Sequence, residues 1–229
     1  MKLYIYEHCP FCIRPRMVIN ANGLKDQVTL EVLANDDEAA HISRVGVKQV
    51  PFLEKNDGEY LLESLVICDY FNQMKDHPAI VDCGDQNQQA RDLVTQINDA
   101  SRYFVYPRFI LHPQNQADFP TESAKDYFRA KKQKSIGDFT HNLKHPEKAI
   151  EQTKPLLAQL NQILAETTFL GADQLSWDDV FIFPVLRNLT IAQDVLTLPD
   201  NVANYVKRVA EKTQIDLYQL YDFSAVINA

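Results

Sequence analysis

The sequence lacks several features that mark particular classes of protein. Only 4 of its 229 residues are cysteine, too few for a disulfide-stabilised scaffold. No run of about eighteen apolar residues could span a bilayer, and no basic-then-apolar signal peptide opens the chain. Lys and Arg number 23 against 31 Asp and Glu, which argues against nucleic acid or an anionic membrane as a partner. We therefore expect a cytoplasmic protein that works in a reducing compartment.

The apolar pattern divides the chain into two unlike parts. Residues 1–75 follow the order β-α-β-α-β-β-α, with strands predicted at 3–6, 28–33, 51–54 and 60–62. Residues 76–86 are polar and predict a linker. From residue 87 onward only helical patterns occur, near 87–111 with a kink at Pro107, 121–143, 147–166, 177–193 and 200–212. We therefore predict a thioredoxin-like α/β domain over 1–75, followed by an all-helical domain over 87–229.

Two local patterns stand out in the helical part. Ser176 followed by Asp179 three residues later is close to a capping box and marks the start of the helix at 177. The run Lys131-Lys132-Gln133-Lys134 concentrates positive charge on one predicted helix. Against the net charge of −8, this run predicts a solvated helix face rather than a nucleic-acid site.

The motif that organises the sequence is Cys9-Pro10-Phe11-Cys12, placed between a predicted strand and a predicted helix that stops at Gly23. With Cys9 as the N-cap, Pro10 occupies the first helical position, where its missing N–H costs nothing. The N–H groups of Phe11 and Cys12 then have no partner within the helix and can point at the Cys9 sulfur. Cysteines of C-x-x-C motifs at helix starts have pKa values of roughly 3.5–7.5. We therefore predict Cys9 as the nucleophile and Cys12 as the resolving thiol.

Other side chains near this motif could adjust the Cys9 pKa. A helix dipole contributes only about 0.3–1 kcal/mol, so we attribute most of the lowering to N–H···S hydrogen bonds. Arg16 and Lys48 are candidate cationic helpers. His8 precedes the nucleophile, and we expect it to contribute at most steric or weak electrostatic tuning. Tyr6 ends the strand beside the motif and is expected to pack rather than to act as an acid.

A C-x-x-C pair can also form half of a zinc site, but zinc needs four ligands. No second C-x-x-C or C-x-x-H is present, and the next cysteine is Cys68. A c-type haem attachment is excluded because Ile13, not His, follows Cys12. Cys68 lies in an apolar helical pattern and is expected to be a small buried residue. Cys83 lies in the predicted linker, and no role is assigned to it.

Several segments together resemble one protein family, the bacterial glutaredoxin 2 family, whose members are large glutaredoxins built like a glutathione transferase. The segments are Leu3-Tyr4-Ile5-Tyr6, His8-Cys9-Pro10-Phe11-Cys12, Lys48-Gln49-Val50-Pro51, Glu63-Ser64 and residues 183–190. The resemblance implies a thioredoxin-like domain followed by a helical domain of glutathione-transferase-like architecture. It also implies glutathione-dependent reduction of protein disulfides and glutathione mixed disulfides, in electron transport and cell redox homeostasis. A cytoplasmic monomer without a metal is expected, with glutathione as co-substrate and disulfide-containing or glutathionylated proteins as partners.

The resemblance also assigns roles to residues at matching positions. Val50 and Pro51 match the pair in which a cis-proline exposes the preceding backbone N–H and C=O to the cysteinyl part of glutathione. Glu63 and Ser64 match the pair that binds the γ-glutamyl end, where a helix-start N–H suits a carboxylate. Pro15 departs from the family pattern and is expected to bend the first helix. The glutathione contacts implied in full are Phe11, Gln49, Val50, Pro51, Glu63 and Ser64.

Two other functions stay open at this stage. A glutathione transferase would share the two-domain layout, but such enzymes activate the thiol of glutathione with a Ser or Tyr hydroxyl and have no use for Cys12. A metal- or cluster-binding module would use the same fold without exchange chemistry. Rapid conjugation of a model electrophile would favour the first alternative, and a coloured dimer that bleaches with chelator would favour the second.

Overall fold

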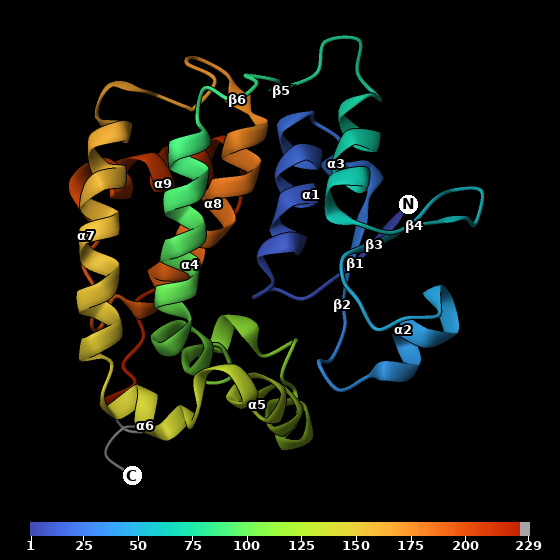
Figure 1. The fold of residues 1–229 in the computed structure, drawn as a ribbon. Helices are drawn as coiled ribbons and strands as arrows, with labels where there is room; N and C mark the ends of the chain where they lie inside the picture. The colour runs from blue at the N-terminus through green and yellow to red at the C-terminus, as the bar shows by residue number, and fades with distance from the viewer. Residues whose placement is uncertain (225–229) are drawn as a thin grey trace.

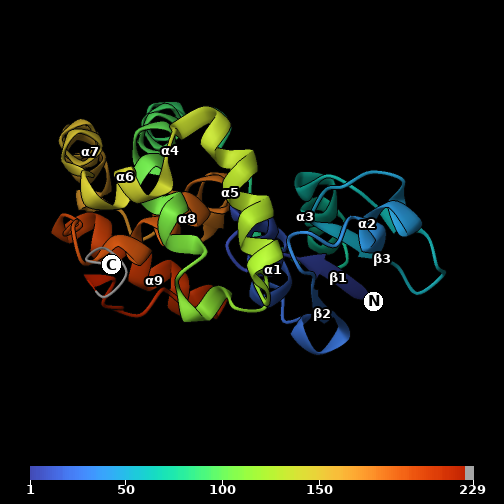
Figure 2. The same ribbon diagram turned by 90° about the horizontal axis from the view of Figure 1, so that it is seen from below.

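In this computed structural model, residues 1–224 are described, so the last five residues of the predicted helical domain lie outside the described residues. The chain forms a mixed α/β domain from its N-terminal third and a larger helical domain from the rest, lying side by side (Figure 1). In Figure 2 the helix α5 (Glu122–Ile136) overlies the junction between the two domains. The predicted fold class is confirmed.

The N-terminal domain is built around one four-stranded sheet with the strand order β2-β1-β3-β4. Strands β1 and β2 are parallel, as the β-α-β spacing predicts, whereas β3 is antiparallel to both β1 and β4. Leu3, Tyr4 and Ile5 of the central strand β1 are buried, because helices and neighbouring strands cover that strand. The elements are β1 (Lys2–Ile5), α1 (Pro10–Ala21), η1 (Lys25–Gln27), β2 (Thr29–Val32), α2 (Glu38–Val45), β3 (Phe52–Glu54), β4 (Tyr60–Leu61) and α3 (Ser64–Asn72).

The helical domain packs around its long helix α4, which contacts α6, α7 and α8. The capping box at the start of α8 is confirmed: the Asp179 N–H donates to Ser176 Oγ (3.4 Å), and the Ser176 N–H donates to Asp179 Oδ2 (2.7 Å). The elements are α4 (Gln88–Phe109), η2 (Pro113–Asn115), α5 (Glu122–Ile136), α6 (Phe139–Lys144), α7 (Glu147–Ile163), η3 (Leu164–Glu166), α8 (Trp177–Leu189), η4 (Thr190–Ala192) and α9 (Asp200–Thr213).

The single helix predicted over 121–143 is wrong, because the structure divides it into α5 and α6. Gly137 follows the end of α5 with φ at +75°, a backbone region that glycine adopts without steric cost. Asp138 then caps α6, its carboxylate accepting the His141 N–H at 2.7 Å. A glycine followed by a capping aspartate was therefore a stop-and-restart signal in the sequence.

The segment predicted as a polar linker contains a short strand, β5 (Ile80–Val81), which pairs in parallel with β6 (Leu175–Ser176). Asn72 holds this strand through its side chain, which donates to the Ile80 carbonyl (3.0 Å) and accepts the Ile80 N–H (3.3 Å). The expectation of an entirely helical C-terminal part is corrected by this two-stranded sheet. It ties the segment after α3 to the start of α8.

The two domains share a continuous apolar core along α1. That helix contacts α3 on one side and α8 and α9 on the other. Cys12, Ile13 and Met17 on α1 are fully buried, and Pro15 lies inside the helix, which continues to Ala21. Within residues 1–224, none of the helices has the length and apolar character needed to cross a bilayer.

Candidate active site

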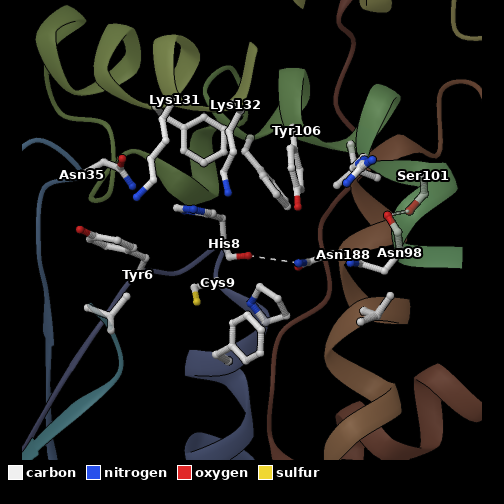
Figure 3. A pocket seen from close by; sticks show the side chains of 18 of the residues that line it. Tyr6, His8, Cys9, Asn35, Asn98, Ser101, Tyr106, Lys131, Lys132 and Asn188 are labelled. Carbon is white, nitrogen blue, oxygen red and sulfur yellow. Dashed lines mark hydrogen bonds between the residues drawn. The ribbon is translucent and has the colours of Figure 1, made fainter. Parts of the chain in front are cut away.

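The structure places Cys9 at the N-cap of α1, with Pro10 in the first turn, as the sequence predicts. Cys9 is half-buried, whereas Cys12 is fully buried one helical turn further on. The Cys12 sulfur accepts the backbone N–H of Tyr6 at 3.4 Å, which fixes it against the end of β1. Only the first of the two thiols therefore faces the cavity described below (Figure 3).

The surroundings of the pair shift the pKa values of the two thiols in opposite directions, lowering that of Cys9 and raising that of Cys12. The hydrogen bond from the Cys12 thiol is the largest effect that lowers the Cys9 pKa, which reaches about 7 although burial opposes the shift. The positive charge of His8 and the N–H groups of Cys12 and Phe11 lower the Cys9 pKa further. Burial and the bond to Cys9 raise the Cys12 pKa well above its ordinary value. Near neutral pH, Cys9 is thus the partly ionised thiol and Cys12 its protonated donor.

Two parts of the sequence-based account of this acidity need correction. The side chain of Cys12, rather than backbone N–H groups, makes the main hydrogen-bond contribution to the low Cys9 pKa. The candidate cations are engaged elsewhere: Arg16 pairs with Glu7 at 2.7 Å, and Lys48 donates to the Asn35 carbonyl at 2.5 Å. His8 supplies the charge instead.

We expect a Cys12→Ala variant to titrate its Cys9 thiol at higher pH than the wild-type midpoint near 7. The reason is that a hydrogen bond donated to a thiolate stabilises the charged form, so its removal raises the pKa. Thiolate absorbance or the rate of alkylation, each followed against pH, measures the midpoint. Cys83→Ala is the control and leaves the midpoint unchanged, since Cys83 lies outside the cavity lining. An unshifted midpoint in Cys12→Ala contradicts the assigned hydrogen bond.

The Cys9 sulfur opens onto a cavity of about 450 Å³ between the two domains. Phe11, Gln49 and Val50 line it together with Cys9, so four of the predicted site residues share one cavity. The Val50–Pro51 peptide bond is cis. The opposite wall comes from the helical domain, and its lining residues include Asn98, Ser101, Tyr106, Tyr127, Phe128, Lys131, Lys132 and Asn188 (Figure 3).

Besides the buried Cys12, the predicted glutathione contacts Pro51, Glu63 and Ser64 do not line this cavity. Glu63 is exposed at the N-cap of α3, with φ at +67°, and Ser64 begins that helix. Ser64 connects to the cavity through Arg14, whose Nη1 donates to Ser64 Oγ at 3.5 Å. The Arg14 guanidinium also lies over the ring of Phe11, 4.7 Å from its centroid. Arg14 therefore links the start of α3 to Phe11 in the cavity wall.

A buried histidine positions the loop that carries Gln49, and sequence reasoning missed it. His41 Nδ1 lies 3.0 Å from the Gln49 carbonyl, and His41 Nε2 lies 2.9 Å from Tyr6 Oη. Burial lowers the His41 pKa, which favours the neutral ring that donates to Gln49 and accepts from the Tyr6 hydroxyl. Burial also raises the Tyr6 pKa, so Tyr6 is a fixed phenol that packs beside the site.

The lysine run of α5 behaves only partly as predicted, because Lys131 and Lys132 line the cavity and Lys132 is half-buried. The Lys132 ammonium lies over the rings of Tyr106 (5.0 Å) and Phe128 (5.6 Å), and burial lowers its pKa. From the opposite domain, burial lowers the pKa of Lys48 to about 8. Lys131 and Lys134 are exposed as predicted, although Lys131 lies at the cavity. The cavity thus has a basic wall in an acidic protein.

The helical domain also holds the segment that precedes the nucleophile, through Asp118, which no sequence pattern marked, and through two residues of the segment 183–190, to which no role was assigned. Asp118 is fully buried, and its carboxylate accepts the backbone N–H groups of Glu7 (2.8 Å) and His8 (3.0 Å). Arg187 Nη1 donates to the Glu7 carbonyl, and Asn188 Nδ2 donates to the His8 carbonyl, both at 3.1 Å. Figure 3 shows the Asn188 contact as a dashed line. Three side chains of one domain therefore fix two residues of the other.

Metal binding has no support in the side-chain geometry of residues 1–224, which brings together no group of three or more His, Cys, Asp or Glu able to hold an ion.

Comparisons with known proteins match both halves of the chain. The family model described as "Glutaredoxin 2, C terminal domain" matches residues 89–221, and "Glutathione S-transferase, N-terminal domain" matches residues 3–79. The chain is 35% identical to glutaredoxin 2 of Escherichia coli K12 over 218 residues, which cover 95% of this chain and 97% of that protein. It is 23% identical over 191 residues to pig glutathione S-transferase omega-1, covering 82% of this chain and 67% of that protein.

Solved structures of a glutaredoxin 2 and of a glutathione transferase are also similar to this chain. Salmonella typhimurium glutaredoxin 2, solved in complex with glutathione, superposes with a TM-score of 0.84 at 35% identity, covering 94% of this chain and 95% of that one. The glutathione transferase GSTFuA3 of Phanerochaete chrysosporium shares the fold, with a TM-score of 0.73 at 16% identity, covering 96% of this chain and 98% of that one. Since the first of these likenesses spans nearly the whole length of both proteins, this chain belongs to the glutaredoxin 2 family.

Proposed function

We propose that Cys9 is the nucleophile and Cys12 the resolving thiol of this protein, which as a member of the glutaredoxin 2 family is a glutathione-dependent thiol–disulfide oxidoreductase. The observation that carries the assignment is the opposed acidity of the two thiols: Cys9 has a pKa of about 7 at a cavity, and Cys12 is buried and protonated. A thiolate is the attacking species in disulfide exchange, and a pKa near ambient pH gives the fastest attack.

With a glutathione mixed disulfide as substrate, the Cys9 thiolate attacks the glutathione sulfur. A Cys9–glutathione disulfide forms, and the substrate leaves as a thiolate that takes up a proton. A second glutathione, as its thiolate, attacks the glutathione sulfur of this adduct, so glutathione disulfide leaves and the Cys9 thiolate is regenerated. Cys12 takes no covalent part in this route.

With a protein disulfide as substrate, Cys9 forms a mixed disulfide with one protein sulfur. Cys12 then loses its proton and attacks the Cys9 sulfur, which releases the reduced protein and leaves a Cys9–Cys12 disulfide. Two glutathione molecules reduce that disulfide. Glutaredoxin couples lie at about −200 to −230 mV, close enough to the glutathione pool for this cycle to run.

Glutathione is proposed to lie along the edge of the cavity, from the nucleophile toward α3. Phe11, Gln49 and Val50 line the cavity beside Cys9. At the other end, Ser64 and the free N–H groups at the start of α3 suit the γ-glutamyl carboxylate. Glu63, exposed beside them, suits the ammonium.

We also propose domain boundaries, an oligomeric state and a cellular compartment for this protein. We divide the chain into a thioredoxin-like domain over 1–75, a connecting segment over 76–86 and a C-terminal domain over 87–229, which is close to the two matched ranges. We further propose a cytoplasmic monomer that passes electrons from glutathione to disulfide-containing or glutathionylated proteins in cell redox homeostasis.

The proposed function is tested by measuring two activities of one preparation. We expect rapid, glutathione-coupled reduction of a small glutathione mixed disulfide, together with slow or undetectable conjugation of glutathione to a model electrophile. The reason is that Cys9, rather than glutathione, is the activated thiol in this site. Conjugation that far outpaces disulfide exchange overturns the proposal in favour of a transferase. A coloured, chelator-sensitive dimer without exchange activity overturns it in favour of a cluster-binding protein.

A further inference from the structure

A histidine–carboxylate pair involves His8, which precedes the nucleophile in the chain and lines the same cavity, and neither of its members carries a proton in the mechanism above. His8 Nδ1 is 2.6 Å from Asp118 Oδ2, and both side chains are buried, with relative exposures of 9% and 0%. The pair joins residues 110 positions apart, one from each domain. Asp118 also accepts the backbone N–H groups of Glu7 and His8, so its carboxylate is held from two sides and cannot swing away.

Aromatic rings fix the plane of the imidazole. His8 stacks on Tyr6, with 5.6 Å between ring centroids, and packs against Phe109, Phe119 and Phe128 at 5.1 Å each. Because Nδ1 faces a carboxylate, that nitrogen carries a proton in both charge states of the ring. The second nitrogen, Nε2, has no hydrogen-bond partner among residues 1–224, and His8 lines the same cavity as Cys9 (Figure 3).

We propose that His8 is a catalytic proton carrier for the disulfide exchange at Cys9, and that Asp118 is the positioning residue that keeps its Nε2 available to the cavity. This inference rests on the proposed function of Cys9. It gives the helical domain a direct part in the chemistry, because Asp118 comes from that domain.

The proton movements balance over one turnover. In the first exchange the Cys9–glutathione disulfide forms and the substrate is released as a thiolate. This thiolate takes the Nε2 proton of the His8 imidazolium. In the second, the neutral Nε2 takes the thiol proton of the incoming glutathione, whose thiolate then attacks the adduct. Cys9 leaves as a thiolate and His8 is again an imidazolium. The net reaction moves one proton from glutathione to the substrate thiol, and no other reactant is needed.

Other titratable and charged groups surround the imidazole, and the test must separate them from it. Tyr6 is unsuited to carry the proton, because burial raises its pKa and its hydroxyl is engaged by His41. Lys132 is the strongest rival, since its ammonium lies over the Phe128 ring that packs on His8. The titratable and charged groups around His8 include Cys9 at the N-cap of α1, Tyr6 after β1, Lys48 before β3, Tyr106 on α4, Asp118 before α5, Lys131 and Lys132 on α5 and Arg187 on α8.

The experiment follows the second exchange alone, in an Asp118→Asn variant over a range of pH. The Cys9–glutathione adduct is formed first and confirmed by mass, and its reduction by glutathione is then timed. Asparagine keeps the shape but can present an N–H to His8 Nδ1, which shifts the ring proton to Nε2 and removes the base. Glutathione, with an ordinary thiol pKa near 8.5, is only about 3% ionised at pH 7, so the base accelerates this step at most about 30-fold.

We expect the wild type to exceed Asp118→Asn by about tenfold or more at pH 7, within the ceiling of about 30-fold set by thiol ionisation. At pH values well above 8.5, where glutathione is already a thiolate, this rate ratio should fall and become constant. His8→Gln, which keeps the backbone contacts to Asp118, should give the same profile even if Asp118→Asn folds poorly. The exposed His145 provides the control, and His145→Gln should give a ratio of one throughout.

A ratio that is the same at every pH overturns the inference, because a structural or leaving-group effect does not depend on the ionisation of glutathione. A pH-dependent ratio in Lys132→Gln, with none in His8→Gln, also overturns it and moves the role to the lysine. Formation of the Cys9–glutathione adduct tests the proposed function of Cys9 independently. If the adduct forms but the ratio of wild-type to variant rates is the same at every pH, the role of His8 is refuted and the role of Cys9 is not.

Discussion

A Cys9→Ser variant is expected to lose at least about a thousandfold of its activity toward a small glutathione mixed disulfide, the scale of loss typical for removal of an essential nucleophile. A serine hydroxyl does not ionise near neutral pH and cannot form the adduct with glutathione. Cys12→Ser is expected to keep a substantial fraction of the activity, because the mixed-disulfide route does not use Cys12 covalently and a serine hydroxyl can still donate to the Cys9 thiolate. A glutathione-coupled assay measures all three proteins.

The same pair of variants separates the two classes of substrate. With a protein disulfide, Cys12→Ser should lose most of its activity, since the mixed disulfide on Cys9 then lacks a resolving thiol. Cys83→Ser is the matched control for a cysteine-to-serine change, and it should behave as wild type because Cys83 is outside the cavity lining. Full activity in Cys9→Ser would show that the central assignment is wrong.

The largest expected effect on stability comes from an ion pair of the helical domain in which the arginine is buried and the aspartate is partly exposed. Arg108 is fully buried on α4, and its guanidinium binds both carboxylate oxygens of Asp194, with Nε–Oδ1 at 3.0 Å and Nη2–Oδ2 at 2.5 Å. We expect Asp194→Asn to lower the free energy of unfolding by about 2 kcal/mol, because the change leaves the buried Arg108 charge without its counter-ion, while solvent access at Asp194 limits the loss. Urea unfolding followed by circular dichroism measures this difference.

An exposed ion pair provides the comparison. Lys207 and Glu211 lie one turn apart on α9 at 4.0 Å, and both side chains are solvent-exposed. Glu211→Gln should change the unfolding free energy by less than about 0.5 kcal/mol, as is usual for surface pairs. If Asp194→Asn is no less stable than Glu211→Gln, burial does not control the strength of these pairs in this protein.

The elements that the sequence predicted well are those with a long local signal. The helices at 147–166, 177–193 and 200–212 have clear apolar periodicity or a capping box, and the structure places helical segments there within a few residues. The nucleophile could be predicted equally well from the sequence, because an N-cap cysteine followed by proline is a local pattern. By contrast, β5 and β6 have two residues each, too few for any periodicity to be read.

The parts of the site that the sequence did not reveal depend on contacts between distant segments. Asp118 lies in an ordinary polar stretch, and its importance comes from three bonds to residues more than a hundred positions earlier. Lys131 and Lys132 were predicted to be solvated because charge runs usually are. The packing of α5 across the domain junction (Figure 2) places both in the lining of the cavity that holds Cys9. Tertiary placement of this kind leaves no mark on nearby sequence.

The hold of Asp118, Arg187 and Asn188 on residues 7 and 8 bears on how modular this protein is. Residues 1–75 contain both cysteines and look like a transplantable unit. Grafted onto another scaffold, however, that unit would leave behind all three side chains that anchor the backbone just before the nucleophile. The two domains therefore form a single unit for protein engineering, because a functional site can be transferred only if both domains are transferred together.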